Sequence, residues 1–179
     1  YNAEAIIRSA ECFGLQHIHA LQHLRPPFLP AQKDSLNDSA QNDSYVTWQG
    51  PAKWVTIQPH AVTATYTIDD YFNEMRRRGC CIVATSPHAT ETLADLSLSQ
   101  PIALLFGNEG RGLSTQALAA ADKQIKVPIY GFTESFNVSV CVALCLYDLI
   151  TRLRASTLPW RISYDEQQKI LSEWLRKSE

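Results

Sequence analysis

A glycine-rich segment at residues 106–114, FGNEGRGLS, holds one acid, Glu109, and one base, Arg111, directly after the apolar run Pro101–Phe106. A strand that leads through such a turn into a helix often binds a ligand, because backbone N–H groups point outward and missing side chains allow close approach. A P-loop needs a lysine after its last glycine, and the dinucleotide fingerprint needs GxGxxG, whereas this segment reads GxxGxG. The turn alone therefore indicates either another kind of ligand site or a purely structural turn.

A second polar segment follows the next expected strand. Residues 131–137, GFTESFN, lie between the stretch Gln124–Pro128 and a long helical pattern that begins at Asn137. Ser135 and Asn137 could each cap that helix, but the segment is more polar than a cap requires. Loops at the carboxyl ends of neighbouring parallel strands are where α/β sheets bind ligands. The two segments together therefore predict one site.

Hydrophobic periodicity places these segments in an alternation of helices and strands. Helices are expected at residues 2–13, 68–78, 115–121 and 137–154 and from Ser163 onward, and strands at 17–21, 53–57, 80–85, 101–106 and 124–128. Thr67, Ser114 and Ser163 are suitable N-caps. Leu24–Ser44 is polar, contains three prolines and is expected to be a mobile loop. The order predicts an α/β fold with a mostly parallel sheet flanked by helices.

The composition is that of an ordinary globular protein, with 45% hydrophobic residues, 19% charged residues and a net charge of −2. Bulk charge therefore does not indicate a nucleic-acid partner, and basic clusters such as Arg76–Arg78 are expected to be solvated helix ends. The five cysteines are odd in number and form no CxxC pair, so we expect reduced, small apolar residues in a cytoplasmic protein, with no metal site. No run of 18 apolar residues is present, and no membrane association is expected.

Three segments, in order along the chain, resemble the motifs of the SpoU–TrmH group of SPOUT RNA 2′-O-ribose methyltransferases. They are NAEAIIR, with Asn2 and Arg8; GNEGRGLS, with Glu109; and VPIYGFTESFNVSV, with Ser135 and Asn137. The resemblance implies an enzyme that binds S-adenosylmethionine in a deep trefoil knot, made from the C-terminal part of the sheet. Knots are rare, and hydrophobic periodicity cannot predict one.

The same resemblance implies which residues hold the cofactor, largely through backbone groups of three loops. The matching positions are Thr85, Gly107, Val127, Ile129 and Phe136. Phe136 stands where leucine is usual in the family, and it keeps an apolar wall for the adenine. Gly107 is expected to give the cofactor backbone room.

The catalytic residues that the resemblance implies are Arg8, Asn2, Glu109, Ser135 and Asn137. Arg8 would lie beside the target ribose and phosphate. The family is often described with this arginine as the base, although an arginine is ordinarily fully protonated and would otherwise bind phosphate and stabilise the forming alkoxide. Without the motif, Arg8 reads as a surface residue and Asn2 as an N-cap. Glu109 would fix the glycine turn by accepting backbone N–H bonds or would orient Arg8, while Ser135 and Asn137 would hold the third loop.

The segment GPAKWVTI at residues 50–57 looks most like members that act on tRNA, including those that methylate a D-loop guanosine. Ribosomal RNA is the alternative substrate, and a non-catalytic RNA-binding homologue is a further alternative. The resemblance also implies a homodimer, with the helix at 137–154 in its interface. We expect a methyltransferase domain at residues 1–155 and a helical extension at 156–179, packed on or beside it.

Overall fold

The computed structural model describes residues 2–22 and 53–178, and the predicted loop Leu24–Ser44 lies outside these ranges. The chain forms two compact units. The first combines residues 3–61 with 159–179, and the second combines Asn2 with 62–158. The predicted domain boundary after residue 155 stays a prediction. Within the described ranges, no helix has both the length and the apolar character needed to cross a bilayer.

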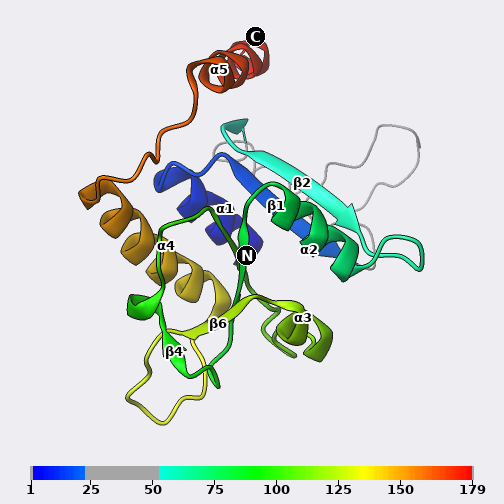
Figure 1. The fold of residues 1–179 in the computed structure, drawn as a ribbon, viewed down its shortest axis with the longest axis vertical. Coiled ribbons are helices and arrows are strands. Elements are labelled where there is room, and N and C mark those ends of the chain that lie inside the picture. The colour runs from blue at the N-terminus through cyan, green and yellow to red at the C-terminus, as the bar shows by residue number, and fades with distance from the viewer. Residues whose placement is uncertain (1, 23–52, 179) are drawn as a thin grey trace, which may run out of the picture. The chain divides into compact units, whose positions relative to one another are not determined.

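In its described residues, the first unit contains two α-helices and a two-stranded parallel sheet (Figure 1). Helix α1 (Asn2–Cys12) buries Ile7 and Ala10, three residues apart on one face, and Gly14 follows it with a φ of 78°. Strand β1 (His17–Gln22) pairs in parallel with β2 (Thr56–Ala61). Helix α5 (Tyr164–Ser178) completes this unit. The helices predicted at residues 2–13 and from Ser163 onward are confirmed, and so is the strand predicted at 17–21. Each predicted end lies within one or two residues of the observed end.

The strand predicted at residues 53–57 is displaced along the chain, because β2 runs from Thr56 to Ala61. Pro59 lies inside it and pairs with Ala20 of β1. A proline lacks the N–H that a ladder needs, and it is tolerated at the edge of a sheet. In this two-stranded sheet both strands are edges, so Pro59 is accommodated.

Helix α5 is anchored within the first unit by a pair of tryptophans. The indole Nε1 of Trp174 donates to the carbonyl of Trp54 at 3.0 Å, and the two rings meet edge to face with centroids 5.6 Å apart. Ile170, one turn earlier, is buried. The predicted cap is confirmed, because the Ser163 hydroxyl accepts from the Glu166 N–H at 3.2 Å.

The second unit is built on a four-stranded parallel sheet in the order β4-β6-β3-β5. Its strands are β3 (Cys81–Thr85), β4 (Glu91–Thr92), β5 (Ile102–Leu105) and β6 (Lys123–Lys126). Strand β3 lies between β5 and β6, and residues 81–84 are all buried, as their continuous apolarity predicted. The predicted α/β class with a parallel sheet is therefore confirmed, and the trefoil knot stays a prediction.

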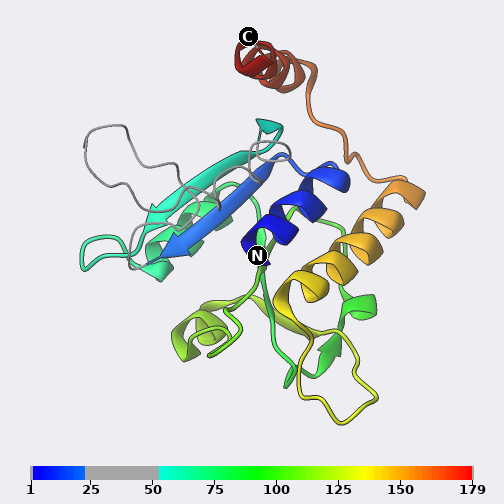
Figure 2. The same ribbon diagram turned by 180° about the vertical axis from the view of Figure 1, so that it is seen from behind.

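Three helices flank this sheet, and each begins at the predicted cap. They are α2 (Ile68–Arg77) after Thr67, α3 (Thr115–Ala120) after Ser114, and α4 (Val138–Ala155) after Asn137. Helix α4 supplies Cys145 and Leu149 to the core, where they pack with Val83, Leu93 and Ile125. Figure 2 shows α4 from behind, in gold.

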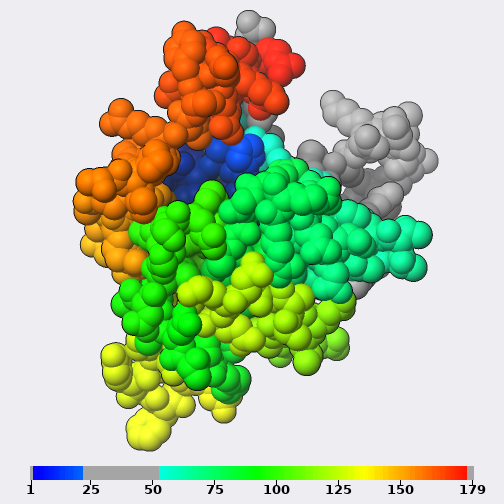
Figure 3. Space-filling model, viewed as in Figure 1, coloured from blue at the N-terminus to red at the C-terminus, as the bar shows by residue number. Residues whose placement is uncertain are grey.

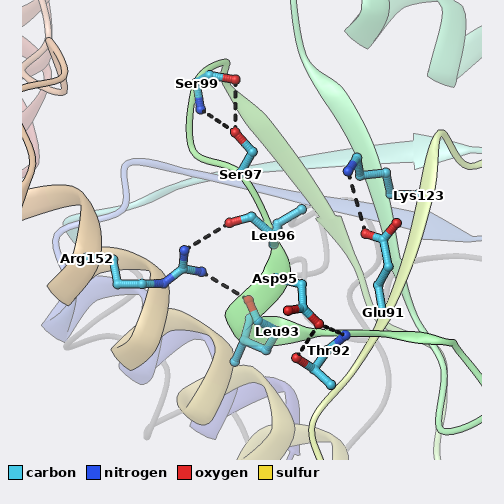
Figure 4. A network of polar contacts seen from close by, with 9 residues as sticks. All are labelled: Glu91, Thr92, Leu93, Asp95, Leu96, Ser97, Ser99, Lys123 and Arg152. Carbon is cyan, nitrogen blue, oxygen red and sulfur yellow. Dashed lines mark hydrogen bonds and ion pairs between the residues drawn. The ribbon is translucent and has the colours of Figure 1, made fainter.

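Two short elements were not predicted, namely β4 and the 3-10 turn η2 (Leu93–Asp95) that follows it. These elements have only two and three residues, which are too few to show a hydrophobic periodicity. Arg152 of α4 holds this region: its guanidinium donates to the carbonyl oxygens of Leu96 at 2.9 Å and Leu93 at 3.0 Å (Figure 4). Tertiary hydrogen bonds therefore define what local sequence does not.

Arg76 is not a solvated helix end, contrary to the prediction for the basic cluster. Its Nε donates to Asp122 at 2.9 Å, and the other oxygen of Asp122 accepts from the Ile82 N–H at 2.8 Å. Desolvation acts to raise the pKa of Asp122, but the hydrogen bonds from Arg76 and Ile82 outweigh it and hold the pKa below its usual value. This carboxylate therefore links α2 to the start of β3.

Candidate active site

The carboxyl ends of three neighbouring strands, β5, β3 and β6, open into one cavity of about 540 Å³ in the second unit. Its walls come from residues 85–88 after β3, 106–113 after β5, and 125–127, 129 and 134–138 at and after β6. Both polar segments of the sequence therefore line the same space. The cavity lies at the sheet edge where parallel α/β proteins bind ligands, and its being the predicted site stays a prediction.

Eight of the ten predicted site residues line this cavity. They are Thr85, Gly107, Glu109, Val127, Ile129, Ser135, Phe136 and Asn137. Asn2 is hydrogen-bonded to one of them, as described below. Arg8 is exposed on α1, in the first unit, and its approach to the cavity stays a prediction.

Asn137 joins all three motif segments through a single side chain. Its Nδ2 donates to Glu109 Oε1 at 2.6 Å and to Asn2 Oδ1 at 3.1 Å. Its Oδ1 accepts from the N–H of Ser139 at 2.9 Å and caps α4. An N–H can only donate and a carboxylate can only accept, so these partners define the orientation of the amide. Asn137 therefore caps α4 and, with the same side chain, connects Asn2 to Glu109.

The glycine turn is held by Asn108 rather than by Glu109. Asn108 Oδ1 accepts from the Arg111 N–H at 2.8 Å, and its carbonyl accepts from the Gly112 N–H at 2.9 Å. The expectation that Glu109 fixes the turn through backbone N–H groups is therefore corrected, since its hydrogen bond goes to Asn137. Sequence reasoning missed Asn108, although an asparagine that opens a glycine-rich turn is a known signal for this local hydrogen bond.

Two of the glycines are required by the path of the chain. A Cβ on Gly107 would overlap the backbone of Gly112 and Leu113, so the chain itself uses the room that we expected the cofactor to use. Gly112 has a φ of 65°, in the left-handed region that favours glycine. Gly110 has no such requirement, because its φ is not positive and its nearest neighbour to an added Cβ is 3.9 Å away.

The Thr85 hydroxyl holds two strand ends together. It donates to the carbonyl of Leu105 at 2.8 Å, across the β3–β5 pair at the floor of the site. Its hydroxyl oxygen keeps a lone pair for a ligand. Thr85 is thus a positioning residue for the two loops that begin there.

The cavity walls combine apolar surface with charges of both signs. Phe106, Val127 and Phe136 give apolar surface, and Glu109 and Glu134 give two carboxylates. Lys126 and Arg111 also line the cavity and give two bases. S-adenosylmethionine has a flat adenine base, a cationic sulfonium and an amino-acid end with charges of both signs. Apolar walls with charges of both signs can bind these three parts, so the residues present fit this cofactor.

A thiol pair lies at the start of α4 beside this cavity. Cys141 lines it, and a hydrogen bond from Cys145 lowers the pKa of Cys141. The same hydrogen bond and burial raise the pKa of Cys145. Across residues 2–22 and 53–178, no three histidine, cysteine or acidic side chains gather in a way that could hold a metal ion.

Comparison with known proteins agrees with this arrangement. Residues 1–147 match the SpoU rRNA Methylase family. A tRNA (guanosine(18)-2′-O)-methyltransferase of Borreliella burgdorferi is 32% identical over 177 residues, which cover 98% of this chain and 72% of that protein. The corresponding enzyme of Escherichia coli K12 is 29% identical over 180 residues, covering 97% of this chain and 69% of that protein.

Solved structures share the fold. The A. aeolicus TrmH/SpoU tRNA modifying enzyme superposes with a TM-score of 0.73 at 27% identity, over 99% of this chain and 82% of that one. AviRb of Streptomyces viridochromogenes, a SpoU methyltransferase solved with AdoMet, has a TM-score of 0.67 at 22% identity, over 87% of this chain and 56% of its own. With the family matched over residues 1–147, this chain belongs to the SpoU rRNA Methylase family.

Proposed function

We propose that this chain transfers a methyl group from S-adenosylmethionine to a ribose 2′-hydroxyl of RNA, and that its substrate is tRNA. The observation that carries the proposal is Asn137, whose amide links Asn2 and Glu109 beside the cavity. Three segments that the resemblance assigns to catalysis are thereby brought to one point. Support for the cofactor comes from the chemistry of the cavity walls and from the AdoMet complex of AviRb.

The loops of the second unit bind and orient the cofactor in this proposal. Gly107, Val127 and Ile129 present backbone groups, and Phe136 covers the adenine face. Thr85 keeps the loop ends in register. When bound, S-adenosylmethionine supplies an electrophilic methyl group on a sulfonium. The wall carboxylates Glu109, which accepts a hydrogen bond from Asn137, and Glu134 favour this cation through their negative charge.

The remaining residues act on the RNA. Arg8 binds the phosphate beside the target ribose and stabilises the alkoxide that forms as the 2′-hydroxyl loses its proton. In the family this arginine is described as the base itself, a role that would need an unusual environment because the guanidinium ordinarily stays protonated. Asn2, Glu109 and Asn137 keep the substrate side of the cavity rigid, and Ser135 lines it beside them. Positioning supplies much of the rate enhancement in such a transfer.

The proposed substrate rests on relatives that span nearly the whole chain. The two nearly full-length relatives described above are named for guanosine 18 of tRNA, so we propose a D-loop guanosine. Ribosomal RNA is the second candidate, because the matched family carries rRNA methylation in its name. We also propose a cytoplasmic homodimer, in which the exposed side chains Val140, Leu144 and Tyr147 of α4 form a stripe for the second subunit.

Labelled methyl transfer tests the proposal directly. Unmodified tRNA and rRNA transcripts are incubated with the protein and labelled S-adenosylmethionine, and the modified nucleoside is mapped. We expect label on a ribose of tRNA, and loss of that label in Arg8→Ala. Absence of label from every RNA, label on a base, or full activity of Arg8→Ala would each refute the proposal.

A further inference from the structure

Two aromatic side chains project fully into solvent from the loop that joins β6 to α4. Tyr130 is 96% exposed and Phe132 is 109% exposed. Among the residues that the structure describes, neither ring has a hydrogen bond or a ring contact. The loop protrudes from the second unit as the yellow segment of Figure 3. Exposing two large rings is costly in water, so they point to a partner.

The position of these rings is defined by the residues on either side of them. Ile129 lines the cavity just before Tyr130, and Glu134–Asn137 line it just after Phe132. The two rings therefore belong to the rim of the cavity in which the methyl group is to be delivered.

We propose that Tyr130 and Phe132 form a stacking platform for an unstacked base of the RNA substrate, next to the ribose that is methylated. The proposal rests on the proposed function. Specific RNA recognition mostly uses single-stranded loops whose bases are splayed out of the stack, and aromatic side chains are groups on which such bases stack. Stacking accepts any base, because every base has a π-face.

A second copy of the chain fits the two exposed rings less well than an RNA base does. The aliphatic neighbour Ile129 lines the cavity, and the other neighbours of the two rings within the loop, Gly131, Thr133 and Glu134, give little aliphatic surface. Interfaces between identical subunits are more apolar than the general surface. The stripe on α4 described above offers such a surface separately. Two exposed rings with so little aliphatic surface around them suit a flat base better than a subunit interface.

The decisive experiment is a double-mutant cycle on RNA binding. The full chain, Tyr130→Ala, Phe132→Ala and the double variant are titrated with a fluorescent, unmodified tRNA transcript and with the same transcript carrying an abasic target nucleotide. Tyr130→Phe and Phe132→Tyr keep a ring, and Tyr164→Ala removes a ring that is 72% exposed on α5. The Kd for S-adenosylmethionine and the sedimentation coefficient are measured in parallel.

We expect each loop alanine variant to weaken binding of the intact transcript by about 5- to 100-fold. The abasic transcript should bind the wild type more weakly, and the double variant should no longer distinguish the two transcripts. The ring-keeping variants and Tyr164→Ala should stay within about twofold of wild type. The salt dependence should keep its slope, because no phosphate contact is removed.

Three outcomes would overturn the stacking platform: a double variant that binds RNA as wild type does, equal losses on intact and abasic transcripts, or dissociation into monomers that parallels the loss of RNA binding. The last result would assign the rings to a subunit contact. A wild-type protein that methylates no RNA refutes the proposed function instead. A wild type that methylates RNA, with an unchanged KM for RNA in the double variant, refutes only the platform.

Discussion

The side-chain amide of Asn137 donates a 2.6 Å hydrogen bond to the carboxylate of Glu109, and the same nitrogen donates to Asn2. These partners lie 28 and 135 residues away in the sequence. A single amide thus joins Asn2, the glycine turn and the start of α4, all within the second unit. The oxygen of the same amide caps α4, so a rotation that breaks the bonds to Glu109 and Asn2 also removes the cap and destabilises α4.

Asn137→Asp tests this joint. The variant keeps a cap acceptor but loses both N–H donors and places a second carboxylate beside Glu109. We expect a loss of about 1–2 kcal/mol of stability at pH 8. Two adjacent carboxylates raise one pKa, so the loss should shrink as pH falls through that raised value. Thermal unfolding from pH 8 to pH 5 measures this, with the uncharged Asn137→Ser as control. Equal pH dependence in both variants would contradict the joint.

Alanine substitutions at the three glycines of the turn should lower the free energy of unfolding by amounts that follow a fixed order. Gly107→Ala overlaps backbone and should cost about 3 kcal/mol or more. Gly112→Ala forces a left-handed φ on a residue with a Cβ and should cost about 1–2 kcal/mol. Gly110→Ala is the matched control, and it should stay within about 0.5 kcal/mol. Urea unfolding of the three variants gives the order, and a control as damaging as Gly112→Ala would refute the described turn.

Arg152→Met should release η2 from α4. The variant keeps an apolar stem but loses both donations to the carbonyls of Leu93 and Leu96, which we expect to cost about 1–3 kcal/mol. Asp148→Asn is the comparison, because it removes only an i,i+4 ion pair with Arg152, worth about 0.3–0.5 kcal/mol. Hydrogen exchange should show faster exchange of the Leu96 N–H in Arg152→Met alone. Equal destabilisation by both substitutions would argue against the carbonyl contacts.

Asp122 should make the stability of the second unit depend on pH in the acidic range. Its pKa is lowered in the folded chain, so its contribution is present above the pKa of the unfolded state, about 4, and is lost as pH falls through the folded value. Asp122→Asn should therefore be less stable than wild type at pH 7, and the difference should narrow between pH 4 and pH 2. Guanidinium unfolding at several pH values checks this. A difference that stays constant over the range would show that the carboxylate charge contributes nothing.

The parts of the fold that sequence predicts well are those with local causes. Thr67, Ser114 and Asn137 cap their helices through bonds within a few residues, and β3 is recognisable because it is apolar throughout. The shift of β2 and the short β4 depend on pairing with distant strands, which no local pattern encodes. Pattern reasoning has no access to threading of the chain, so the knot depends on resemblance alone.

The site was predictable as a place but not as a set of contacts. The two polar loops had to meet, since parallel strands end at one edge of the sheet. Which side chain holds the glycine turn is a different question. Asn108 and Glu109 are neighbours with similar acceptors, and only the three-dimensional path of the turn shows that Asn108 faces the backbone N–H groups while Glu109 faces Asn137.

The central strand β3 carries a consequence for how this enzyme family can diversify. The loops at the cavity begin at the ends of β3 and of its two partners, β5 and β6, and residues 82–84 of β3 are wholly inaccessible to solvent. The rim is therefore mounted on the part of the second unit that should exchange its amide hydrogens last. Substitutions at loop positions such as Tyr130 and Phe132 can then accumulate without unfolding the sheet that supports the loop, so what the loop binds can change while the fold is kept.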